Sequence, residues 1–384
     1  DRVQTALATL TSTIDVLPST QASLEKLTQL DKTLRQQTAA IAPLTQDDQW
    51  RASFKPDETA WWWFLKVKEP SEPFSWLWSA AALASITASF SLMGDIVPRF
   101  LVGGPDLLSS FLITLQSLGG LLSTGAVVKA IQATPQQPMG DRILPKHWWG
   151  KASAGLAGLV LLGVVGLRLS LPYWSDRYTQ WGMENYRNGN WSSAESDYQR
   201  ALKLNPDNVQ AHLYAGVLSE DLQEFDKARS HYQLAIQGGS PTAINNLARL
   251  QILTKKDYAA AVALLLKALD DEKHQPLNPV TKHAVLKNLG WARLQQKNYP
   301  DAEARLLEAI EMQPTIQFEN DDRRREAIAD THCLLAQVME GLGDKQAALA
   351  KWKICNQNLN ITIPEHDAWN AIAEQRLTPQ ETRP

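Results

Sequence analysis

The stretch GMENYRNGNWSSAESDYQRALKLNP (residues 182–206) decides the fold of the C-terminal half of this chain. The same order of small, aromatic and large residues returns in LGWARLQQKNYPDAEARLLEAIEMQP (289–314). Small residues at fixed positions let two antiparallel helices approach closely, and a large residue fills the space between neighbouring units. The pattern therefore predicts a stack of helix pairs. Its key positions in the first stretch are Gly182, Trp191, Ala194, Tyr198 and Ala201.

The aromatic position of this pattern recurs along the chain. Each recurrence is followed three residues later by an alanine and ten residues later by another, and successive units start 33 to 41 residues apart. Periods of this length are typical of solenoids built from one helical hairpin per repeat. The recurring aromatic positions are Trp191, Phe225, Tyr258 and Tyr299.

A fifth unit, LLAQVMEGLGDKQAALAKWKIC (334–355), departs from the pattern at two positions. Lys345 stands where the aromatic residue belongs, and Cys355 replaces the last small residue. We therefore expect looser or atypical packing in this unit. The chain has one other cysteine, Cys333. Two cysteines cannot form a disulfide framework, so we expect both to be buried free thiols.

These units resemble the tetratricopeptide repeat family, because they reproduce its pattern of small, aromatic, small, large and small residues followed by proline. The resemblance covers residues 175–362 and implies five helical repeats, followed by a capping helix at 364–376. We recognise no family for residues 1–173. The fold class that we expect is all-α, with N-terminal helices, α-helical membrane spans and a C-terminal tetratricopeptide α-solenoid.

The spacing of apolar residues predicts a helical or coiled-coil segment over residues 1–42. Val3, Leu7 and Leu10 begin a heptad seam, which favours either a short coiled coil that oligomerises the protein or a helical hairpin packed on its own chain. A linker at 43–73 follows and contains the Trp-rich interfacial stretch 61–64. The chain begins at Asp1, so we expect further residues to precede it.

Three apolar stretches in residues 74–173 predict a membrane domain, with spans near 74–93, 107–128 and 152–172. A helix rises about 1.5 Å per residue, so about twenty residues cross the ~30 Å hydrocarbon core. Nine of the 14 tryptophans lie from residue 50 to residue 174 and flank these stretches, as expected at a bilayer interface. The middle stretch is the least apolar, and a re-entrant or interfacial segment is the alternative there.

Flanking lysines and arginines predict the orientation of the spans. With three spans, the repeats lie opposite the side that holds more positive charge, and that side faces the cytoplasm. With two spans, the repeats share the N-terminal side, and a cytoplasmic array is the natural expectation. The more positive side holds Arg51, Lys55, Lys66, Lys68, Lys129, Arg142, Lys146 and Lys151, and the other side holds Arg99, Arg168, Arg177 and Arg187.

The sequence carries no pattern typical of an enzyme. The net charge of −3 gives no basic surface for nucleic acid. The seven histidines are scattered, and no H-E-x-x-H or C-x-x-C spacing is present. We therefore predict no catalytic residues, no cofactor and no metal site.

The function that we predict is a membrane-anchored scaffold that binds a protein or peptide partner through its repeats. The alternative is a regulatory or structural subunit of an oligomeric transport, pore or signalling assembly. We expect an integral membrane protein of a bacterial inner or internal membrane. Homo-oligomers could form through the N-terminal helices and spans.

In tetratricopeptide arrays the first helix of each pair lines a concave groove, and the resemblance implies the contact positions here. Cations, amides and an indole in one groove suit an acidic peptide or a C-terminal carboxylate. The set lacks the family's full carboxylate-clamp pattern, so another ligand stays open. The candidate groove residues are Met183, Arg187, Asn245, Arg249, Lys287, Asn288 and Trp291.

Overall fold

A computed structural model describes residues 18–45, 52–53, 55, 74–104, 106–123, 148–272 and 276–378. The regular elements in these ranges are all helical, so the predicted all-α fold class is confirmed. Backbone contacts divide the chain into two compact units. One unit comprises Asp1–Ser85 and Thr134–Gly158, and the other comprises Ile86–Ala133 and Leu159–Pro384.

Before the repeats, the described residues include two N-terminal helices and three apolar ones. Their bounds are α2 (Pro18–Gln36), α3 (Thr38–Thr45), α5 (Ser75–Leu101), α6 (Leu107–Ser123) and α8 (Trp149–Leu169). The heptad seam at residues 3–17 and the aromatic stretch 61–64 lie outside the described residues. Leu27 and Leu30 of α2 are exposed, and the choice between coiled coil and hairpin stays a prediction.

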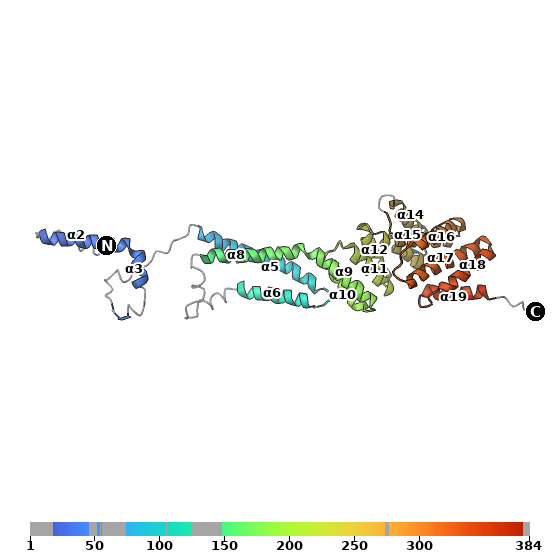
Figure 1. Ribbon diagram of the computed structural model, residues 1–384, viewed down its shortest axis with the longest axis horizontal. Helices are drawn as coiled ribbons and strands as arrows, with labels where there is room; N and C mark the ends of the chain where they lie inside the picture. The colour runs from blue at the N-terminus through green and yellow to red at the C-terminus, as the bar shows by residue number, and fades with distance from the viewer. Residues whose placement is uncertain are drawn as a thin grey trace, which may run out of the picture. The chain divides into compact units, whose positions relative to one another are not determined.

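Among the described residues, α9 to α18 form five consecutive antiparallel pairs, followed by α19 (Figure 1). Each second helix of a pair begins at the aromatic position of the sequence pattern or, in the fifth pair, at Lys345. The bounds are α9 (Leu171–Arg187), α10 (Trp191–Leu204), α11 (Val209–Asp221), α12 (Phe225–Gln237), α13 (Pro241–Leu250), the π-helix η4 (Gln251–Lys255), α14 (Tyr258–Asp271), α15 (Pro279–Gln295), α16 (Tyr299–Met312), the 3₁₀ helix η5 (Gln313–Thr315), α17 (Asp321–Leu342), α18 (Lys345–Asn358) and α19 (Pro364–Leu377).

Close approach between the two helices of a pair explains the small residues of the pattern. A Cβ atom on Gly182 would lie 2.5 Å from the ring of Tyr198, and one on Gly216 would lie 2.6 Å from the ring of Tyr232. Both tyrosines are buried, so their rings have no open space to move into. The glycines are therefore required by packing, because any larger residue would push the paired helices apart.

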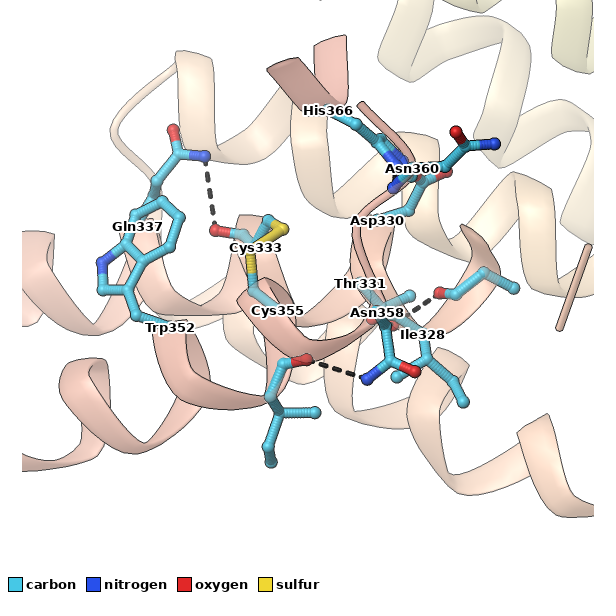
Figure 2. Close-up of a disulfide and its surroundings, with 12 residues drawn as sticks. Ile328, Asp330, Thr331, Cys333, Gln337, Trp352, Cys355, Asn358, Asn360 and His366 are labelled. Carbon is cyan, nitrogen blue, oxygen red and sulfur yellow. Dashed lines mark hydrogen bonds and ion pairs between the residues drawn. A yellow bond between two sulfur atoms is a disulfide. The ribbon is translucent and has the colours of Figure 1, made fainter. Parts of the chain in front are cut away.

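The fifth pair corrects one expectation from the sequence. Cys333 of α17 and Cys355 of α18 are joined by a disulfide with a Cα–Cα distance of 5.0 Å, so they are not free thiols (Figure 2). Cys355, Trp352 and Cys333 are fully buried, so of looser and atypical packing this pair shows the second: a buried disulfide stands where the other pairs have a small residue. The expectation about the thiols was wrong because sequence spacing gave no distance between the two helices, whereas antiparallel pairing brings the cysteines face to face.

The first pair packs on the turn between α5 and α6. Arg200 of α10 is only 5% exposed and donates to the carbonyl oxygens of Phe100 (2.9 Å) and Gly104 (2.6 Å). Its guanidinium lies 3.3 Å from Asp106, which also accepts a hydrogen bond of 2.6 Å from the Tyr178 hydroxyl. A buried arginine is stable only when its donors are satisfied, and this turn satisfies them. The α5–α6 turn is thus fastened to the first repeat.

Two helices among the described residues are long and apolar enough to cross a membrane, Trp76–Leu101 in α5 and Gly150–Leu169 in α8. A shorter apolar helix runs from Leu107 to Ser117 within α6. The predicted middle span extends to residue 128, and its last residues lie outside the described ranges. The predicted number of spans therefore stays a prediction.

Candidate protein-binding face

The first helices of successive pairs lie side by side: α9 contacts α11, α13 contacts α15, and α15 contacts α17, which in turn contacts α19. We call the row of polar side chains that connects these helices the inner ladder. It consists of Glu220, Arg249, Asn245, Asn288, Lys287, Asp330 and His366. These residues include four of the predicted groove positions.

The first rung of the inner ladder joins α11 to α13. The guanidinium of Arg249 donates to Glu220 over 2.7 Å. Glu220 also accepts a hydrogen bond of 2.9 Å from the Tyr232 hydroxyl, and its side chain is only 9% exposed. A buried carboxylate needs such partners, so this ion pair has a structural role.

The second rung joins α13 to α15 through two amides. The Asn288 side-chain N–H donates to Asn245 Oδ1 over 2.9 Å. Asn288 is 1% exposed, and Asn245 is also buried. Asn288 Oδ1 has no hydrogen-bond partner in the described part of the chain. In this conformation neither amide presents a large surface to a partner.

The third rung joins α15, α17 and α19 at Asp330. Lys287 Nζ donates to one carboxylate oxygen over 2.7 Å, and His366 Nε2 lies 2.8 Å from the other. His366 Nδ1 accepts from the backbone N–H of Asn360 over 3.0 Å, so the proton sits on Nε2, which donates to Asp330. Figure 2 shows Asp330 and His366 directed toward one another.

Asp330 stays ionised because of these partners. Burial alone would raise the pKa of Asp330, but the Lys287 ammonium and the hydrogen bond from His366 outweigh it and hold the pKa well below its usual range. The charge of Lys287 is therefore neutralised by its own chain. An acidic ligand at this position would have to share Lys287 with Asp330.

The remaining predicted groove residues are not part of this ladder. Met183 and Arg187 lie on α9, where Met183 is half-buried and Arg187 is exposed. The Arg187 guanidinium lies 3.4 Å from the carboxylate of Glu319, in the segment just before α17. The segment before α17 thus reaches the first repeat. Trp291 is half-buried and packs against the buried cores of the pairs around α15. As a binding surface, the seven predicted residues remain a prediction.

Sequence reasoning missed the acidic members of the ladder, Glu220 and Asp330. Glu220 lies 29 residues from Arg249, and Asp330 lies 43 residues from Lys287. No short spacing links the members of either pair, because the register between consecutive repeats decides which side chains meet. The described residues contain no group of three or more His, Cys, Asp or Glu side chains placed to hold a metal ion.

Comparison with known proteins gives the following similarities. Residues 179–244 match the tetratricopeptide repeat family model. The type IV pilus assembly protein PilF of Pseudomonas aeruginosa is 26% identical over 152 residues, which are 38% of this chain and 58% of that protein. The chain thus spans less than two thirds of the length of this curated relative.

Two solved structures cover about half of the chain. The structure of Pseudomonas aeruginosa PilF is 19% identical, with a TM-score of 0.41, and covers 55% of this chain and 95% of its own. The crystal structure of PilW, a type IV pilus biogenesis factor, is 21% identical, with a TM-score of 0.43, and covers 54% of this chain and 87% of its own. From the family match and the buried small and large positions of the helix pairs, the C-terminal part of this chain is a tetratricopeptide repeat array.

Proposed function

We propose that this protein is a membrane-anchored scaffold that presents its tetratricopeptide array to a protein or peptide partner. The observation that carries the membrane part is the exposure of α8. Leu156, Leu159 and Leu162 are 66%, 67% and 68% exposed, although the helix is almost wholly apolar. A core helix of a soluble protein would bury such side chains, whereas a membrane helix presents them to lipid.

The partner-binding part of the proposal follows from the architecture of the array. Tetratricopeptide solenoids expose an extended concave surface that is larger than any single helix pair offers. On this surface the charged rungs of the inner ladder are paired within the chain, so they fix the spacing of the first helices. Contact with a partner is therefore expected at the more exposed residues beside the ladder, such as Arg187 of α9.

The alternative of a transport or pore subunit has no specific support among the described residues. An unpartnered charge within a span would favour it. Asp95 of α5 instead pairs with Arg168 of α8 and with Arg99 one turn further along α5. These three charges are paired with one another and lie near the ends of the apolar helices, where an anchor tolerates them.

The test is capture of partners by the detergent-solubilised full-length chain, followed by their identification. Arg187→Glu is the informative variant, because Arg187 and Glu319 are both more than half exposed and their pair contributes little stability. Lys227→Glu on α12 is a matched control, because Lys227 is also exposed and pairs with Glu224. We expect roughly a tenfold loss of capture for Arg187→Glu only, with unchanged thermal unfolding.

Equal capture by both charge-reversal variants would place the interface away from α9. Carbonate extraction of membranes tests the anchor separately, and release of the chain into the supernatant would contradict it. Charge reversal at Arg249 or Lys287 is a poor test, because it would place two carboxylates together in the inner ladder and destabilise the array.

A further inference from the structure

We infer that the repeat array lies on the oxidising, extracytoplasmic side of the membrane, where it carries a structural disulfide, and that its partner is a protein of that compartment. This inference rests on the proposed membrane anchor. Two independent observations carry it, namely the directions of the apolar helices and the cysteine pair in the fifth repeat.

Helices α5 and α8 run in the same direction toward the repeats. Asp95 of α5 pairs with Arg168 of α8. Further along the chain in both segments, the ring of Phe100 near the end of α5 meets the ring of Trp174 in α9, which follows α8 after one residue, with centroids 6.4 Å apart. Since paired positions advance together, the two helices are parallel, and both end at the first repeat.

Helix α6 runs in the opposite direction. It begins beside the repeats, where Asp106 accepts the hydrogen bond from Tyr178. Further along, Gly119 approaches Phe90 of α5, because a Cβ atom on Gly119 would lie 3.3 Å from the Phe90 ring. The chain therefore passes toward the repeats in α5, away from them in α6 and toward them again in α8. With the proposed anchor, these directions agree with the three predicted spans, which put the repeats on the side of the membrane opposite the segment that precedes α5.

The lysines and arginines that flank these helices indicate which side of the membrane faces the cytoplasm. In the flanks nearest the apolar stretches, eight lysines and arginines lie on the side of the segment that precedes α5 and of the connection between α6 and α8; they are Arg51, Lys55, Lys66, Lys68, Lys129, Arg142, Lys146 and Lys151. The three-pass arrangement gives the repeat side four, Arg99, Arg168, Arg177 and Arg187. Cytoplasmic flanks are the richer in such residues. The repeats therefore face away from the cytoplasm.

The cysteine pair indicates the same side without reference to charge. Cys333 and Cys355 are fully buried against each other between α17 and α18, with Gln337 and Trp352 beside them (Figure 2). Disulfides persist in oxidising compartments, whereas cytoplasmic thiols are kept reduced. Closing this bond removes two protons and two electrons from two thiols. A dithiol–disulfide oxidoreductase accepts the electrons by exchange, as its own disulfide becomes a dithiol.

The experiment uses the full chain in a bacterial host, with both native cysteines and an epitope tag after Pro384. Acid-quenched cells are denatured and treated with a maleimide polymer that adds mass to each free thiol. The chain has two cysteines, so the readout is zero or two additions. We expect zero additions before reduction and two after it. In parallel, antibody binding to the tag is compared between intact and permeabilised spheroplasts, and we expect binding in both.

Two results would overturn the inference while the anchor stands. One is a membrane-retained chain with two additions before reduction, and the other is a tag that is reached only after permeabilisation. A second tag inserted after Gly140, between α6 and α8, guards against leaky spheroplasts, and we expect binding there only after permeabilisation. A chain released by carbonate would instead contradict the proposed anchor itself, so the two failures are distinguishable.

Discussion

Replacing Ala302 by leucine tests whether the array is held by tight contacts at its small positions. Ala302 lies in the first turn of α16 and is 0% exposed. Its carbonyl oxygen would lie 3.3 Å from a Cβ atom on Gly290 of α15, so the helices already touch here. Leucine adds three carbon atoms to this contact. Overpacking of this kind costs about 1–3 kcal/mol.

The consequence of that cost can be measured on the full-length chain in detergent. Thermal unfolding is followed by far-UV circular dichroism, and each kcal/mol corresponds to roughly 2–4 °C for a unit of this size. Ala371→Leu in α19 is the matched control, because Ala371 is exposed and leucine there meets no neighbour across a tight contact. We expect a lower midpoint for Ala302→Leu and little change for Ala371→Leu. Equal shifts for the two variants would refute the reasoning that small positions set the helix spacing.

Three further perturbations follow from buried groups. Replacing both Cys333 and Cys355 by alanine should lower the free energy of unfolding by about 3 kcal/mol. The reason is that the separation of 22 residues sets the chain entropy that the disulfide removes from the unfolded state. An unchanged urea midpoint would contradict this. Acidification should destabilise the array between pH 6.5 and 4. Burial and, to a smaller extent, Lys287 lower the pKa of His283 to about 4, and burial and Lys351 do the same for His332. The unfolded state therefore binds more protons than the folded state in this window. Between pH 7 and pH 5 the free energy of unfolding should fall by about 2 kcal/mol for each histidine, which urea titration at the two pH values would measure. Glutamine variants of His283 and His332 that keep the full pH dependence would disprove its assignment to these histidines. Arg200→Met should remove the cation beside Asp106 and the side-chain donor to the carbonyl groups of Phe100 and Gly104, at a cost of about 3–5 kcal/mol. We expect the α5–α6 turn to become cleavable in limited proteolysis, and a turn as resistant as in the unchanged chain would show that Arg200 does not fasten it.

Local patterns were sufficient to predict the repeats. The positions at Trp191, Phe225, Tyr258 and Tyr299 begin the second helix of their pairs, and the alanines three residues later are fully buried. Such positions are readable because helix packing places small residues at a fixed spacing within one hairpin. The groove residues were less predictable. The place of Lys287 in its repeat predicted that its side chain faces the groove. Its partner Asp330 could not be predicted in the same way, because Asp330 lies on α17, the first helix of the next pair.

The sequence by itself determined the helical class, the repeat period and the presence of long apolar segments, because each depends on the order of neighbouring residues. The tertiary structure decided which distant side chains meet. It joined Cys333 to Cys355 and fastened Arg200 to the α5–α6 turn. It also paired Arg249 and Lys287, which the sequence pattern predicted to contact a ligand, with Glu220 and Asp330 of the same chain. These pairings depend on the register between helices and repeats, and register arises only when the packed faces of separate segments come together.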